Sequence, residues 1–60
     1  MTIDQCRAHI GDGVVYDPGH GEREDGVITS VSATHAFVRY SGDQHSKATD
    51  PADLTLLAAR

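Results

Sequence analysis

The chain has 60 residues and a formal net charge of −4, from nine acidic and five basic side chains. Its hydrophobic share is 38% and its aromatic share 5%, without any Trp. Typical domains have roughly 100–150 residues, so this length allows one small domain and excludes a dinucleotide-binding fold or a (β/α)₈ barrel. The acidic balance also disfavours a free-standing binder of nucleic-acid phosphates, since such proteins usually carry positive charge.

The cysteine content and the apolar runs indicate the environment of the chain. A single cysteine, Cys6, excludes an intramolecular disulfide and favours a reducing, cytoplasmic setting. The longest apolar runs have three or four residues, too few to span a bilayer. The first residues lack the basic and apolar regions of a secretory signal. We therefore expect one cytoplasmic domain over residues 1–60, without a membrane partner.

A short amphipathic helix is predicted over residues 2–10. Thr2 and Gln5 have the spacing of a capping box at a helix N-terminus. An apolar stripe with helical spacing runs along one side and consists of Ile3, Cys6 and Ile10. A helix this short is not stable alone in water, so we expect it to pack on the rest of the chain.

β-branched and aromatic residues predict five short strands, separated by polar or glycine-containing segments. The strands are expected at residues 14–16, 26–32, 35–40, 46–49 and 54–57. The second and third form a hairpin in this interpretation, because only Ala33 and Thr34 lie between them. Alternation along the strands predicts a core of Val14, Val27, Val31, Val38, Tyr40, Leu54 and Leu56.

A helix start is predicted just before the last strand. Asp50 is the expected N-cap and Pro51 occupies the first helical position, but only one turn of 3₁₀ helix fits there. Short, closely spaced strands favour a closed barrel, because an open sheet of this size leaves long edges unpaired. The expected fold is all-β, a five-stranded small barrel over residues 13–57 with a short N-terminal α-helix packed on it.

Four stretches of the chain together resemble the SH3-like small barrels of the Tudor and KOW type. They are residues 13–16 (GVVY), 24–31 (EDGVITSV), 37–40 (FVRY) and 50–54 (DPADL). The order of a long loop after the first strand and a 3₁₀ turn before the last is also that of an SH3-like barrel. More narrowly, the chain is similar to short uncharacterised proteins of bacteriophages and prophages. This resemblance implies an SH3-like fold, and a phage or prophage origin with a location in the host-cell cytoplasm.

In SH3-like barrels the loop after the first strand flanks the usual ligand groove, and here that loop is acidic. We expect it to favour basic peptides and to repel nucleic acid. The candidate binding residues are the aromatic and charged side chains Tyr16, Glu22, Glu24, Asp25, Phe37 and Arg39. Phe37 faces outward by alternation, where the N-terminal helix could cover it. The chain has too few aromatic residues to spare for a methyl-lysine cage.

Cys6 and His9 have Cys-x-x-His spacing, which would place both on one side of the predicted helix. The other histidines lack the close spacing of zinc-finger ligands. The favoured interpretation is therefore a buried, apolar Cys6 and a His9 charge at the helix C-terminus. Neither a nucleophile elbow nor a phosphate-binding loop occurs in the sequence. We expect no metal, no cofactor and no catalytic residues.

These patterns favour a non-catalytic protein–protein interaction module that binds a host or phage protein or associates with itself. Two alternatives stay open. Carboxylates gathered on one face would make the chain an acidic inhibitor of a host nucleic-acid enzyme. A nucleic-acid-binding Tudor- or KOW-like barrel would instead gather Arg23, Arg39 and Lys47 on one face.

Overall fold

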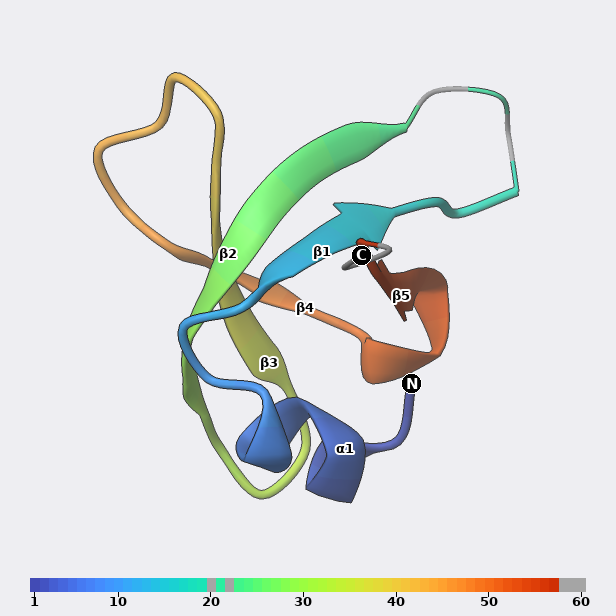
Figure 1. Ribbon diagram of the computed structural model, residues 1–60, viewed down its shortest axis with the longest axis vertical. Helices are drawn as coiled ribbons and strands as arrows, with labels where there is room; N and C mark the ends of the chain where they lie inside the picture. The colour runs from blue at the N-terminus through green and yellow to red at the C-terminus, as the bar shows by residue number, and fades with distance from the viewer. Residues whose placement is uncertain (20, 22, 58–60) are drawn as a thin grey trace.

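The computed structural model describes residues 1–19, 21 and 23–57 (Figure 1). Its elements in chain order are α1 (Ile3–Ala8), β1 (Gly13–Tyr16), β2 (Glu24–Val31), β3 (Ala36–Tyr40), β4 (Lys47–Thr49), the 3₁₀ helix η1 (Pro51–Asp53) and β5 (Leu54–Leu56). The predicted helix, five strands and 3₁₀ turn are confirmed, with ends that differ by at most two residues.

The strands form one antiparallel sheet in the order β4-β3-β2-β1-β5. Figure 1 shows β2, the longest strand, curving through the molecule between β1 and β3. The chain leaves β4 through η1 and returns as β5 beside β1. β4 and β5 are therefore the edge strands, and no pairing among the described residues joins them. Closure into a barrel and the SH3-like assignment remain predictions.

α1 begins with the predicted capping box. The Gln5 N–H donates to Thr2 Oγ1 at 3.1 Å, and the Thr2 N–H donates to Gln5 Oε1 at 2.8 Å. The helix packs against β2 and β3 and buries Cys6. The predicted apolar stripe of the helix is wrong at Ile10. This residue is 49% exposed, because the helix already ends at Ala8. No helix in the described part of the chain has the length and apolar character to cross a membrane.

The N-terminal residue contacts the other end of the chain. The Met1 backbone nitrogen donates to the carbonyl oxygens of Pro51 and Leu54, both at 2.8 Å. Figure 1 accordingly places the N-terminus beside η1 and β5. These contacts, together with the packing of α1, attach the N-terminal segment to the sheet.

The core lies inside the curved sheet. Its buried apolar members are Cys6, Val14, Ile28, Ala36, Val38, Tyr40 and Leu54. The predicted core positions Val14, Val38, Tyr40 and Leu54 are thus confirmed, and Val31 packs against the cluster while staying partly exposed.

Two predicted core positions are wrong. Val27 is 39% exposed, because Gly26 and Ile28 are the residues of β2 that face the core. The alternation of β2 is therefore opposite to the predicted one. Leu56 is 42% exposed, since it lies on an edge strand with no further strand to cover it.

A β-bulge explains how Val31 reaches the core despite the reversed phase of β2. Ile28 pairs with Val38, whereas Ser30 pairs with Phe37, so Thr29 is an extra residue in β2. The Thr29 hydroxyl donates to the Phe37 carbonyl oxygen at 3.1 Å. Because one residue is inserted, Ile28 and Val31 both pack against the core although they are three positions apart.

Candidate binding site

A hollow of about 380 Å³ is lined by residues of β1, β2, β3, β4 and η1, together with the N-cap of η1. Its lining consists of Tyr16, Glu24, Tyr40, Lys47, Ala48, Thr49, Asp50 and Asp53. Three of these side chains are carboxylates and one is a cation. We refer to this hollow as the acidic groove.

Two tyrosines form the aromatic part of the acidic groove. The rings of Tyr16 and Tyr40 meet edge to face, with centroids 6.0 Å apart and planes at 69°. Tyr40 is only 7% exposed, and its hydroxyl lies 2.7 Å from Thr49 Oγ1. Tyr16 is half-buried and pairs in register with Glu24 on β2 and Leu54 on β5. Strand pairing therefore places a carboxylate directly beside the aromatic pair.

The remaining carboxylates of the acidic groove come from η1. Asp50 is its N-cap, and Oδ1 accepts from the Ala52 N–H at 3.0 Å. Asp53 lies one turn later, and its carbonyl oxygen accepts from the Asp17 N–H at 2.8 Å. Neither Glu24 nor Asp53 has a cation at ion-pair distance among the described residues. These two carboxylates are available to a ligand.

The local charge of the acidic groove is negative. Its cation, Lys47, lies 3.6 Å from the carboxylate of Asp43 and is thereby partly neutralised. Burial is the main cause that raises the pKa of the Tyr40 hydroxyl, and the nearby Tyr16, Glu24 and Asp43 raise it further. The groove therefore suits a positively charged ligand.

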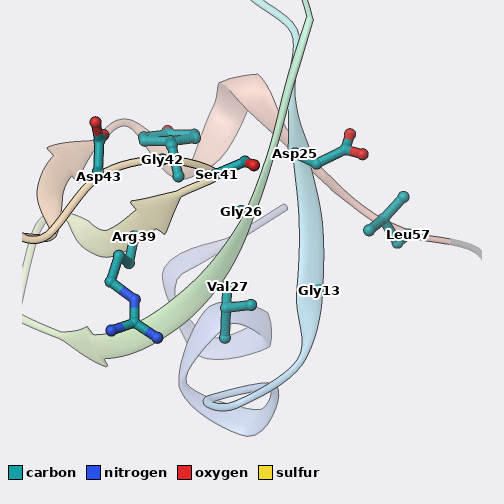
Figure 2. Close-up of a pocket in the computed structure, with 10 residues that line it drawn as sticks. Gly13, Asp25, Gly26, Val27, Arg39, Ser41, Gly42, Asp43 and Leu57 are labelled. Atoms are coloured by element: carbon teal, nitrogen blue, oxygen red, sulfur yellow. The ribbon is translucent and has the colours of Figure 1, made fainter.

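A second hollow, of about 420 Å³, lies across β1, β2 and β3 on the outer side of the sheet (Figure 2). Its lining consists of Gly13, Asp25, Gly26, Val27, Arg39, Tyr40, Ser41, Gly42, Asp43 and Leu57. We refer to it as the outer hollow. Figure 2 shows Val27 at its centre, with Arg39 to one side and with Asp25 and Leu57 to the other.

Glycine explains why the outer hollow is concave at β1. Gly13 is paired with Val27, which is paired in turn with Arg39, so the three form a row across the sheet. A Cβ at Gly13 would lie 2.9 Å from Leu57 Cδ1. Leu57 therefore lies over the glycine and adds an exposed apolar side chain beside Val27.

Four of the predicted binding residues line the two hollows, and Glu24 and Asp25 also line a smaller hollow of about 340 Å³ together. Tyr16 and Glu24 line the acidic groove. Asp25 and Arg39 line the outer hollow. The difference follows from the strand period, because Glu24 and Asp25 are neighbours on β2 and project to opposite faces of the sheet.

The two other predicted binding residues are placed differently. Phe37 is half-buried on β3, between Ser30 of β2 and Ala48 of β4, and lines neither hollow. It shares the outer side of β3 with Arg39, as alternation predicted. Cys6 of α1 packs instead with the inward-facing residues of the sheet. Glu22 lies outside the described residues.

Sequence reasoning missed the contribution of η1 to the site. Asp50 is the expected N-cap in the sequence, but no local pattern shows that η1 lies beside Tyr16. The pairing of Tyr16 with Leu54 brings them together, and Leu54 directly follows Asp53. A prediction that β5 pairs with β1 would have found these carboxylates.

Cys6 and His9 have separate surroundings despite their Cys-x-x-His spacing. Cys6 is wholly buried in the core, and this burial raises the pKa of its thiol. His9 Nδ1 lies 2.9 Å from Asp12 Oδ2 on the surface. No cluster of three or more His, Cys, Asp or Glu side chains that could hold a metal ion occurs in residues 1–19, 21 and 23–57.

The cations of the nucleic-acid alternative occupy different places. Arg23 Nε lies 3.0 Å from Asp17 Oδ2 in the loop after β1. The pKa of Asp17 is lowered mainly by the Gly19 N–H that donates to it, and Arg23 contributes. Lys47 lines the acidic groove, whereas Arg39 lines the outer hollow. In the described part of the chain, neither the acidic groove nor the outer hollow contains all three cations.

Comparison of the chain with protein-family models, with curated proteins and with solved structures finds no match. The resemblance to SH3-like and phage proteins therefore stays a prediction from the sequence.

Proposed function

We propose that the chain is a non-catalytic interaction module that binds a basic segment of a protein partner in the acidic groove. The observation that carries this proposal is the edge-to-face pair of Tyr16 and Tyr40 beside Glu24, Asp50 and Asp53. A Lys or Arg side chain can lay its apolar stem against a tyrosine ring while its charged end meets the carboxylates. The groove thus offers both parts of such a side chain a complementary surface.

An SH3-like closed barrel is the form that we propose for this module. Three observations support it: β5 pairs with β1, η1 directly precedes β5, and the longest connection between strands follows β1. Closure would leave the acidic groove beside the loop of residues 17–23. This is the position that the resemblance predicts for a ligand groove.

The distribution of charge supports a protein partner over nucleic acid. Arg23 and Lys47 already have carboxylate partners, and the net charge of the chain is −4. Such a surface attracts a basic peptide and repels a phosphate backbone. An acidic inhibitor of a nucleic-acid enzyme would use the same carboxylates as part of a wider surface, and capture of the partner from a lysate distinguishes that case.

The proposal can be tested by nuclear magnetic resonance with the ¹⁵N-labelled chain. We would titrate an extended peptide rich in Lys and Arg, the same peptide with Glu at the basic positions, and a single-stranded oligonucleotide. The basic peptide is expected to shift the amide signals of Tyr16, Glu24, Asp50, Ala52 and Asp53, and added salt should weaken this binding. Equal binding of the acidic peptide, or shifts confined to other surfaces, would contradict the proposal.

Charge-neutral variants separate the acidic groove from general acidity. The double variant Glu24→Gln/Asp53→Asn is expected to weaken peptide binding at least about tenfold. The matched control Asp4→Asn/Asp12→Asn removes the same charge outside the groove and should bind as the unmodified chain does.

Capture from a lysate, with nuclease present, then identifies the partner. Retention by the control and loss by the groove variant would support the proposal. Retention of a nucleic-acid enzyme by both would instead indicate the wider acidic surface of an inhibitor.

A further inference from the structure

The outer hollow has the features of a contact surface. Val27 and Leu57 are 39% and 42% exposed, although they are large apolar residues. Arg39 and Asp25 are also exposed, and neither has an ion-pair partner among the described residues. An apolar centre that is flanked by one free charge of each sign is typical of a surface that is covered in an assembly.

We propose that a second copy of this chain covers the outer hollow in a two-fold symmetric dimer. Figure 2 shows Arg39 and Asp25 directed to opposite sides of Val27. In a two-fold interface, if residue i contacts residue j of the partner, then j also contacts i. An axis near Val27 places each Arg39 beside the partner's Asp25, and the same contact repeats on the other side. Val27 and Leu57 then pack against their copies between the two ion pairs.

Self-complementary charge is the reason to choose a second copy over a different ligand. A basic ligand would satisfy Asp25 and leave Arg39 facing a like charge, and an acidic ligand would do the reverse. A copy supplies both charges at once and in the required order. A chain of 60 residues also gains stability from association, since its own core is small.

The dimer does not depend on the proposed peptide groove. Among the described residues, Tyr40 alone lines both hollows, and it is nearly buried. Its hydroxyl is directed to Thr49 and not to the outer side of the sheet. Dimerisation therefore leaves Glu24 and Asp53 accessible, and either proposal can fail while the other holds.

Sedimentation velocity on the full chain tests the dimer. Over protein concentrations from about 5 µM to about 1 mM, the mass should rise from 6.4 kDa towards twice that value. The variants Arg39→Glu and Asp25→Arg each replace two attractive pairs with two repulsive ones. Each should therefore weaken association at least about tenfold.

Mixing the two variants gives the decisive result. In a mixed dimer, Glu at position 39 meets Arg at position 25, and the unchanged Arg39 meets the unchanged Asp25. The mixture should therefore associate more tightly than either variant alone, by at least about tenfold. The double variant Arg39→Glu/Asp25→Arg should likewise recover the association of the unmodified chain.

Control reversals lie on α1, outside the outer hollow. Arg7→Glu and Asp4→Arg change the net charge by the same amounts and should leave the association unchanged. Circular dichroism verifies that every variant is folded. A chain that stays monomeric to about 1 mM would overturn the proposal. A dimer that is indifferent to the Arg39 and Asp25 reversals, or a mixture that does not associate, would overturn it equally.

Discussion

The hydroxyl of Tyr40 lies 2.7 Å from Thr49 Oγ1, and this hydrogen bond joins β3 to the end of β4 inside the protein. Both residues are nearly buried, at 7% and 6% exposure. Thr49 also donates to the Lys47 carbonyl oxygen at 3.3 Å. The bond therefore links the aromatic part of the acidic groove to an edge strand that makes few other contacts with the core.

Removing this hydrogen bond should destabilise the fold. Tyr40→Phe and Thr49→Val are each expected to lower the free energy of unfolding by about 1–2 kcal/mol. Thr49→Val leaves the buried Tyr40 hydroxyl without its partner, whereas Tyr40→Phe removes the hydrogen bond but leaves Thr49 bonded to the Lys47 carbonyl oxygen. In a double-mutant cycle measured by urea denaturation, the coupling should be about 1 kcal/mol. Strictly additive effects would show that the two hydroxyls do not stabilise each other.

Stability should fall in alkaline solution. Burial raises the pKa of Tyr40 above its ordinary value of 10.0, so the folded protein holds this proton more tightly than the unfolded chain does. The stabilisation is complete below pH 10 and is lost as the pH rises through the raised pKa. Urea denaturation at about pH 8 and about pH 11 should show this loss, and Tyr40→Phe should lose less. An identical decrease in both proteins would contradict this assignment.

Gly26 should be far less tolerant of a side chain than Gly13. A Cβ at Gly26 would lie 2.5 Å from Val38 Cγ1 and 3.0 Å from the Arg39 carbonyl oxygen, both in packed surroundings. Gly26→Ala is therefore expected to cost about 1–3 kcal/mol of stability by overpacking.

Gly13→Ala is the matched control, because the one close contact of its Cβ, at 2.9 Å, is with the terminal Cδ1 of the exposed Leu57 side chain. Its effect should stay within about 0.5 kcal/mol. Thermal unfolding followed by circular dichroism measures both variants. Equal loss of stability in the two would show that the close contacts at Gly26 are relieved by small movements.

The Cys6 thiol should react only after the protein unfolds. Cys6 has no exposed surface, and burial raises the pKa of its thiol, so the reactive thiolate is both rare and inaccessible. Labelling by a thiol reagent in native buffer should be at least about 100-fold slower than in urea. The exposed control Cys6→Ala/Ala52→Cys should react at similar rates in both. Rapid labelling of the native chain would contradict the packing of α1.

The local elements could be predicted from the amino-acid sequence without any knowledge of the fold. The capping box of Thr2 and Gln5 and the N-cap of Asp50 depend on contacts within one helical turn, so a linear pattern records them. Alternation along Ala36–Tyr40 assigned the faces of β3 correctly, because all apolar residues of that strand except Phe37 lie on the same face. The acidic loop after β1 and the adjacent Tyr16 and Glu24 could also be recognised from the sequence, because these residues are close together in the chain.

The side of β2 that faces the core depends on contacts between strands that are distant in the sequence. Val27 and Ile28 are both apolar and occupy opposite phases, so alternation alone supports either choice. Gly26 and Ile28 point inward because the glycine fits between Val38 and Tyr40, where a side chain would clash. The bulge at Thr29 then turns Val31 towards the core. These are contacts between strands, and a linear pattern contains no record of them.

The residues that line each hollow are likewise brought together by the tertiary structure. Asp53 joins Tyr16 through the pairing of β5 with β1, which are separated by most of the chain. Leu57 reaches Gly13 through the same pairing. Local propensity depends on residues a few positions apart in the chain. The two hollows depend instead on which strands become neighbours in the sheet. The burial of the whole core determines this choice of neighbours.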